Sequence, residues 1–174
     1  MLESHCDAFD LLKTLGAPNR LLRHSRLVSQ AADALVSEFR ALGVEFDVLV
    51  VELGAILHDS GKIQHSNELY EAGSLHEQAG QTLLLADGVQ PEIARCCASH
   101  GRWHLPGVSF EERVVALADK LWKGKRESDL ELNIIDEIAA RLGQSRWDVF
   151  GKLDSVFEEI ASRGSEWLLA SSSG

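Results

Sequence analysis

Apolar residues recur along this chain at steps of three and four, the spacing of one face of an α-helix. The clearest stretch runs from about Asn19 to Leu42, where one apolar stripe continues over the whole segment. We find no convincing alternation of apolar and polar residues of the kind that indicates a strand, and no internal repeat. The pattern therefore predicts an all-α fold, a helical bundle.

Turn and cap residues divide this pattern into segments. At Ser74-Leu-His-Glu77 the sequence predicts a capping box, with Glu77 reaching back to the start of a helix. Residues 60–73 are polar and contain glycine, which predicts a loop, and a frayed tail is predicted for residues 165–174. The predicted helices are Cys6–Leu15, Asn19–Leu42, Glu45–His58, one from Ser74, one from Pro91, one capped by Ser109, Leu130–Leu142 and Ser145–Arg163.

Length and composition bound the organisation of the chain. With 174 residues, 45% of them hydrophobic, one compact domain over residues 1–174 can bury a sizeable core. Polar residues that could bind metal or take part in catalysis are concentrated in residues 20–126. The predicted helices over about 130–164 carry apolar positions typical of packing. We expect a single functional region in the first part, supported by packing helices in the second.

Charge and hydropathy exclude several classes of partner. The net charge of −10 disfavours broad attraction to nucleic acid, although a small anionic substrate stays compatible with local basic residues. No run approaches the roughly 18 apolar residues that a membrane span requires. Three cysteines cannot all pair within one chain, which fits a reducing compartment. We expect a cytoplasmic protein, and a homo-oligomer stays open.

Residues able to bind metal recur at inward-facing or helix-end positions. His58 and Asp59 end an apolar helical run, where an unpaired carboxylate would cost several kcal/mol to bury. One inward histidine is usually a hydrogen-bonded core residue, but the full set would need a satisfied polar network in a small helical core. Metal ions would neutralise the carboxylates and hold the imidazoles neutral. The candidate ligands are His24, His58, Asp59, His76, His100 and Asp119.

The sequence resembles the HD superfamily of metal-dependent phosphohydrolases, whose pattern is a histidine, then a His-Asp pair, then a distant aspartate. The matching residues, in order, are His24, His58-Asp59 and Asp119. His76 and His100 resemble the additional histidines of the branch that holds two metals. Within it, the intervals are most similar to those of bacterial enzymes that split dinucleoside tetraphosphates symmetrically. The resemblance spans about residues 20–126, and no purine-reading feature is evident.

The resemblance implies two metal ions. One would be held by His24, His58, Asp59 and Asp119, and the other by His76 and His100, with Asp59 bridging both. A carboxylate has two oxygens to share, and Asp59 is the only candidate carboxylate whose neighbour in sequence is another candidate ligand. A water or hydroxide activated by the metals would attack phosphorus. Imidazole-rich ligation favours iron or manganese, with cobalt or zinc as alternatives, over magnesium.

A phosphorylated substrate also requires cations outside the metal ligands. Lys62, three positions after Asp59, is the main candidate for substrate binding and catalysis, and the lysine at this position of the family's motif is commonly near substrate. The substrate would be a small phosphoester or phosphoanhydride, with a nucleotide or dinucleoside polyphosphate favoured. Further candidate substrate residues, each close in sequence to a ligand, are Arg20, Arg23, Arg102 and Lys120.

Two other functions fit the same residues. HD-type mixed-valent di-iron oxygenases resemble this ligand set, including the additional histidines, and Lys62 does not separate the two activities. The interval of 19 positions from His100 to Asp119 is more similar to the hydrolase branch. A catalytically silent nucleotide-binding module is a third interpretation.

Overall fold

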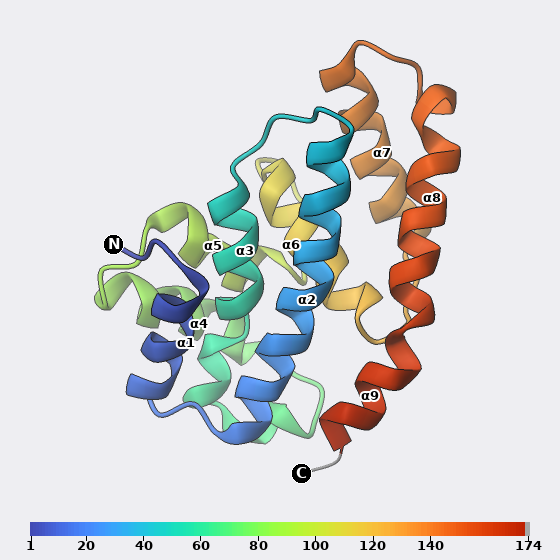
Figure 1. Ribbon diagram of the computed structural model, residues 1–174. Helices are drawn as coiled ribbons and strands as arrows, with labels where there is room; N and C mark the ends of the chain where they lie inside the picture. Colours follow the sequence, from blue (N-terminus) through green and yellow to red (C-terminus); the bar gives the residue numbers. More distant parts are fainter. Residues whose placement is uncertain (173–174) are drawn as a thin grey trace.

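The computed structural model describes residues 1–172, and all regular structure in that range is helical, as predicted. The longest helix, α2, runs through the middle of the molecule and contacts the next longest, α8, which lies at the right edge in Figure 1. The α-helices are α1 (His5–Thr14), α2 (Asn19–Ala41), α3 (Val48–Leu57), α4 (Leu75–Ala86), α5 (Pro91–Ser99), α6 (Phe110–Leu121), α7 (Ser128–Leu142), α8 (Arg146–Ser162) and α9 (Gly164–Ser172).

Two apolar clusters hold these helices together. The larger cluster joins α2 and α6 to α7 and α8, and fully buried Leu35, Leu117 and Phe157 belong to it. The smaller cluster joins α3 to α1, α4 and α5, with Ile56 and Leu84 among its buried residues. Helix α3 contacts α2 and α6 on one side and α1 and α5 on the other. The end of α3 is therefore fixed between the two clusters.

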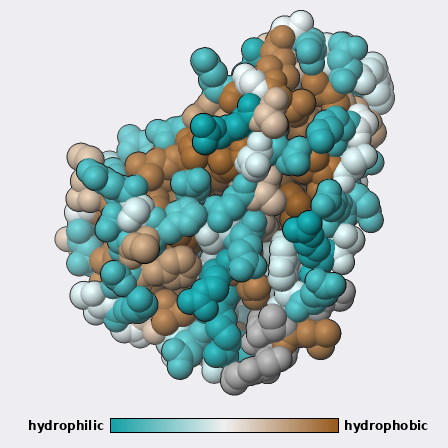
Figure 2. All heavy atoms as spheres, in the orientation of Figure 1, coloured by the Kyte–Doolittle hydropathy of each residue, from teal (hydrophilic) through white to brown (hydrophobic). Residues whose placement is uncertain are grey.

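The surface agrees with this arrangement. The face shown in Figure 2 is mostly hydrophilic, with apolar residues visible between the polar ones, as expected when the apolar stripes of the helices pack inward. Among residues 1–172, no helix combines the length and the apolar character that crossing a bilayer would need.

The predicted loop of residues 60–73 contains two 3₁₀-helices, η1 (Ser60–Ile63) and η2 (Ser66–Leu69). The capping box predicted at Ser74 is wrong, because the Ser74 side chain makes no capping hydrogen bond among the described residues. Glu68 of η2 caps α4 instead: its Oε1 accepts from the Leu75 N–H at 3.1 Å and its Oε2 from the His76 N–H at 3.0 Å. A side chain from outside the local motif thus satisfies the first free N–H groups of the helix.

The prediction of a frayed tail is also wrong for residues 165–172, which belong to α9 (Gly164–Ser172). Gly164 lies directly against Gly124, since a Cβ at Gly164 would be 2.2 Å from the Gly124 nitrogen. Trp167 packs against the larger cluster. The apolar contact of Trp167 stabilises the helix, whereas the polar residues at the end of the sequence had suggested a frayed tail. Residues 173–174 lie outside the described range.

Candidate metal centre

Six potential ligands from five helices and one loop meet beside the end of α3. His24 comes from α2, His58 ends α3, and Asp59 begins the loop that follows. His76 lies in the first turn of α4, His100 ends α5, and Asp119 lies in the last turn of α6. These are the six residues that the sequence singles out. Their convergence follows from helix ends that point at one place rather than from proximity in sequence.

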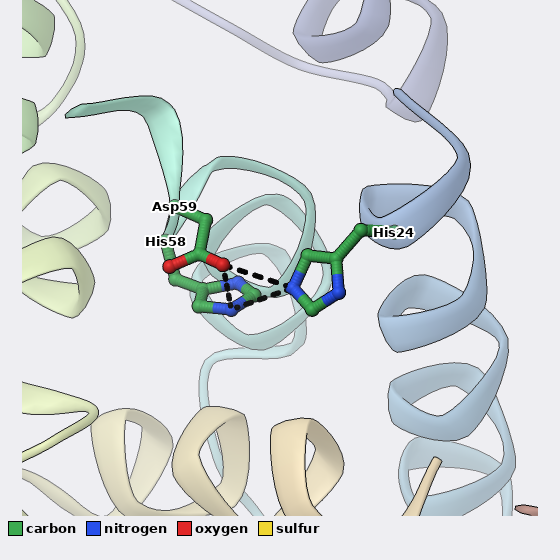
Figure 3. Close-up of side chains that lie close together, drawn as sticks. All are labelled: His24, His58 and Asp59. Atoms are coloured by element: carbon green, nitrogen blue, oxygen red, sulfur yellow. Dashed lines mark hydrogen bonds and ion pairs between the residues drawn. The ribbon is translucent and has the colours of Figure 1, made fainter. Parts of the chain in front are cut away.

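One group of ligands gathers around the Oδ2 atom of Asp59. The His24 Nε2 atom lies 3.0 Å and the His58 Nε2 atom 3.6 Å from this oxygen, and the two nitrogens are 3.4 Å apart. Figure 3 shows the two rings turned toward this oxygen, while the other oxygen of Asp59 points away from them. Asp119 closes the group, with its Oδ1 atom 3.4 Å from His58 Nε2 and 3.7 Å from His24 Nε2. We call this arrangement the His24 side.

A second group lies at the Oδ1 atom of Asp59. The His76 Nε2 atom is 3.1 Å from this oxygen and the His100 Nε2 atom is 3.6 Å from it. The rings of His76 and His100 are 5.6 Å apart between centroids. We call this arrangement the His76 side. Each oxygen of one carboxylate thus faces its own pair of imidazole nitrogens.

The two sides are in contact through His58 and His100. Their ring centroids are 4.8 Å apart, and one donor atom each from His58, His100 and Asp119 lies within 4.8 Å of the others. The same holds for His24, His58 and Asp59, and for Asp59, His76 and His100. The six side chains therefore form one continuous set of nitrogen and oxygen donors.

The donor set fits metal ions better than it fits a hydrogen-bonded network. Asp59 is 2% and His76 5% exposed. Asp59 Oδ1 and His76 Nε2 are both buried without a hydrogen-bond partner among the described residues, although they lie close together. A buried polar atom without a partner costs roughly 1–3 kcal/mol. A divalent cation bound by both atoms would remove that cost.

The electrostatics favour the ligand forms of the carboxylates. Burial raises the pKa of Asp59, but the charge of His58 and the close contacts with the His24 and His76 rings outweigh it and hold that pKa well below its usual value. Burial also raises the pKa of Asp119, whereas His58 and Lys123 bring it well below its usual value. Both carboxylates are therefore ionised at neutral pH.

The imidazoles are oriented through their second ring nitrogens. His58 Nδ1 lies 2.9 Å from the carbonyl oxygen of Ala55, and His100 Nδ1 lies 2.9 Å from that of Cys97. Since a carbonyl oxygen only accepts, each Nδ1 must carry a hydrogen, so in the neutral form of each ring the Nε2 atom has a lone pair that faces the centre. Burial, followed by repulsion from His58, lowers the pKa of His100 to about 4, so this ring is neutral at neutral pH.

His76 differs because its Nδ1 atom lies 2.5 Å from the Oε2 atom of Glu68. Sequence reasoning missed Glu68, which belongs to a polar segment without periodicity.

Two glycines allow the loop after Asp59 to reach α4. A Cβ at Gly61 would lie 1.9 Å from the His76 carbonyl oxygen and 2.6 Å from the Gly80 nitrogen. A Cβ at Gly80 would lie 2.8 Å from the Gly61 nitrogen. The neighbour of Gly80 is therefore the Gly61 backbone, two residues after Asp59. This backbone contact brings Asp59 and His76 together.

A cavity of about 140 Å³ opens beside the His24 side. Two of the predicted substrate residues, Arg20 and Lys62, line it. The Lys62 ammonium donates to Asp59 Oδ2 at 2.6 Å, and the Arg20 Nε–H donates to the Leu69 carbonyl at 3.0 Å. The remaining lining residues are Leu21, His24, Asp59, Leu69 and Trp122.

The other predicted substrate cations lie elsewhere. Arg102 pairs with Glu77 at 3.0 Å and lines a separate groove, and Lys120 points toward Glu127 at 3.8 Å. Arg23 lines a groove beside Trp167. Lys123, which the sequence did not single out, lies 3.6 Å from Asp119 Oδ2. Adjacency to a ligand along a helix does not place a side chain at the site, because successive helical residues point in different directions.

Comparison of the sequence with known protein families identifies the family of the chain. Residues 21–124 match the HD domain family, and this range contains all six candidate ligands. The chain belongs to the HD domain family. Proteins of this family bind divalent metals and are mostly metal-dependent phosphohydrolases. No curated protein and no solved structure matches the chain.

Proposed function

We propose that this HD domain protein is a phosphohydrolase with two metal ions bridged by Asp59. The observation that carries the proposal is the division of the Asp59 oxygens, with Oδ2 facing His24 and His58 and Oδ1 facing His76 and His100. A centre for one metal would need no second imidazole pair on the far oxygen. Iron or manganese fits the imidazole-rich donor set best, with cobalt or zinc next.

The residues of the chain would hold these ions in two groups. His24, His58 and Asp119 would bind one together with Asp59 Oδ2, and His76 and His100 would bind the other together with Asp59 Oδ1. When bound, the ions would lower the pKa of a coordinated water and stabilise negative charge on the phosphoryl oxygens. The Nε2 atoms of His58 and His100 are already directed inward by the Nδ1 hydrogen bonds of the two rings.

The cavity beside the His24 side would receive the substrate. Lys62 and Arg20 supply positive charge at its wall, and Leu21, Leu69 and Trp122 supply apolar surface. Cations beside apolar and aromatic groups suit a phosphate that carries an organic substituent. This combination supports a small phosphoester or phosphoanhydride, with a nucleotide or a dinucleoside polyphosphate as the favoured class.

Lys62 would have two tasks. In the structure its ammonium neutralises Asp59 Oδ2, the oxygen that also faces His24. With positive ions on that oxygen, the ammonium would be repelled and become available for a phosphate oxygen in the same cavity. Its role is then to bind and orient the phosphate rather than to act as an acid or base.

A phosphate-release screen tests this function. Metal-depleted protein would be loaded separately with manganese, iron, cobalt or zinc and offered nucleotides and dinucleoside polyphosphates. We expect metal-dependent cleavage of at least one of these substrates. Oxygen consumption with an organophosphonate or a polyol, without cleavage of any nucleotide, would show the oxygenase activity instead. Tight nucleotide binding without turnover at any metal would indicate a silent binding module.

A further inference from the structure

We propose that Glu68 is a positioning residue that fixes the tautomer of His76 and thereby makes its Nε2 atom a metal ligand. The inference rests on the proposed metal centre and adds a residue that neither the sequence motif nor the family match assigns. Glu68 lies on η2, between the loop that carries Asp59 and the helix that carries His76. Its distance of 2.5 Å from His76 Nδ1 places it opposite the face that His76 turns toward Asp59.

His76 requires such a partner because of its position at the start of a helix. His58 and His100 each end a helix, and their Nδ1 atoms bind carbonyl oxygens of the preceding turn at Ala55 and Cys97. His76 lies in the first turn of α4, so no helical turn precedes it to offer such a carbonyl. A side chain from another segment must supply the acceptor, and Glu68 does so.

The carboxylate of Glu68 is held in one orientation. Glu68 is 6% exposed, and its oxygens accept from the Leu75 N–H, the His76 N–H and the His76 ring. Two backbone donors ensure that the carboxylate acts as an acceptor toward the ring as well.

Gly73 provides the space that this arrangement needs. A Cβ at Gly73 would lie 2.2 Å from Glu68 Oε1 and 2.4 Å from its Cδ atom. Glu68, Gly73 and His76 therefore form one unit, in which the chain bends around the carboxylate before α4 begins. The consequence is a defined hydrogen on Nδ1 and a defined lone pair on Nε2, the atom that lies 3.1 Å from Asp59 Oδ1.

Glu68→Gln tests the role with little change in volume. A glutamine has one accepting oxygen for three donors, so either the ring or the backbone loses its acceptor. If the amide nitrogen faces the ring, it donates to Nδ1 and moves the ring hydrogen to Nε2. Loss of such an outer partner typically weakens metal binding about 10–100-fold. We expect this loss for the metal of the His76 side, with the affinity of the His24 side unchanged.

Glu112→Gln is the matched control. Glu112 is also a buried glutamate that caps a helix, accepting from the Ser109 N–H at 2.9 Å, and its other partner is Arg95 rather than an imidazole. Both substitutions should lower the melting temperature through the weakened cap. Only Glu68→Gln should weaken one metal selectively. Equal metal affinities in the two variants would overturn the proposal.

Nitrogen NMR of the metal-free wild-type protein gives a test that does not depend on either variant folding. At a pH at which the ring is neutral, we expect His76 to carry its hydrogen on Nδ1, and Glu68→Gln to shift the population toward Nε2–H. A wild-type His76 with its hydrogen on Nε2 would refute the positioning role. This readout is separate from the proposed function, because a protein that binds no metal would fail as a hydrolase and could still show the predicted tautomer.

Discussion

The two sides of Asp59 offer similar ligands but are built differently. The His24 side uses residues of α2, α3 and α6, the helices in the middle of the molecule (Figure 1). The His76 side uses the beginning of α4 and the end of α5, joined to Asp59 by a loop with two short 3₁₀-helices. One side is therefore supported by helix packing, and the other depends on a backbone contact and a carboxylate.

From this difference we expect the two proposed metal ions to have separable affinities. Asp119 adds a second carboxylate to the His24 side, whereas the His76 side shares only Asp59. More anionic ligands bind a divalent cation more strongly. Substitutions in the loop and at the start of α4 should thus affect one metal before they affect the other, and the predictions below are arranged by the size of that effect.

Gly61→Ala should have the largest effect. The new Cβ would lie 1.9 Å from the His76 carbonyl oxygen, which belongs to backbone and cannot rotate away. We expect a loss of roughly 3 kcal/mol in the free energy of unfolding, the upper part of the usual range for overpacking, and loss of the metal of the His76 side. Chemical denaturation and elemental analysis measure the two effects.

Gly151→Ala is the control for that substitution. Gly151 lies within α8 with no atom near the position of an added Cβ among the described residues. Alanine should therefore raise stability by up to about 1 kcal/mol through its higher helix propensity. A Gly61 variant with unchanged stability and two bound metals would show that the close backbone contact does not support the centre.

His76→Ala and His24→Ala should each weaken the binding of a different metal ion. We expect each variant to lose strong binding of one metal and keep the other, because each ring faces a different oxygen of Asp59. Titration with cobalt, followed by its absorption spectrum, would report the two sites separately. If His76→Ala weakened both metals equally, the division of the ligands into two groups would be wrong.

Lys62→Ala should have a smaller effect. Loss of one charge-assisted hydrogen bond to a phosphate, worth about 1.5–3 kcal/mol, corresponds to a decrease in kcat/KM of roughly 10–100-fold. Both metals should remain, since Lys62 is not a ligand. Lys120→Ala, whose side chain points toward Glu127, should leave kcat/KM nearly unchanged. A similar loss in both variants would argue for a general effect of charge.

The helical fold and the convergence of the candidate ligands could be predicted from the sequence for one physical reason. Periodicity shows which face of a helix is buried, and polar residues on that face, such as His24 and Asp119, are then conspicuous. His58 and His100 were visible because they end such faces. The positions of the α-helices follow the same logic, and among those of residues 1–172 only the last was missed, where the apolar contact of Trp167 outweighs the polar ending.

The outer residues of the site could not be predicted in the same way. Glu68 acts through contacts with a helix eight positions later, and nothing local distinguishes it from a solvated glutamate. Arg102 and Lys120 adjoin ligands in sequence but turn to Glu77 and Glu127. The partner of a long flexible side chain depends on which groups the tertiary structure places near it. The orientation of such side chains can therefore be known only once the fold is known.

The most direct test of the account is the metal content of Asp59→Ala beside the wild-type protein. Both proteins would be loaded with manganese, freed of excess metal and analysed for metal per chain, with circular dichroism as the check of folding. Because Asp59 is the carboxylate that both groups of imidazoles face, we predict two equivalents in the wild type and almost none in the variant. A folded variant that retains two equivalents would contradict the bridging role of Asp59.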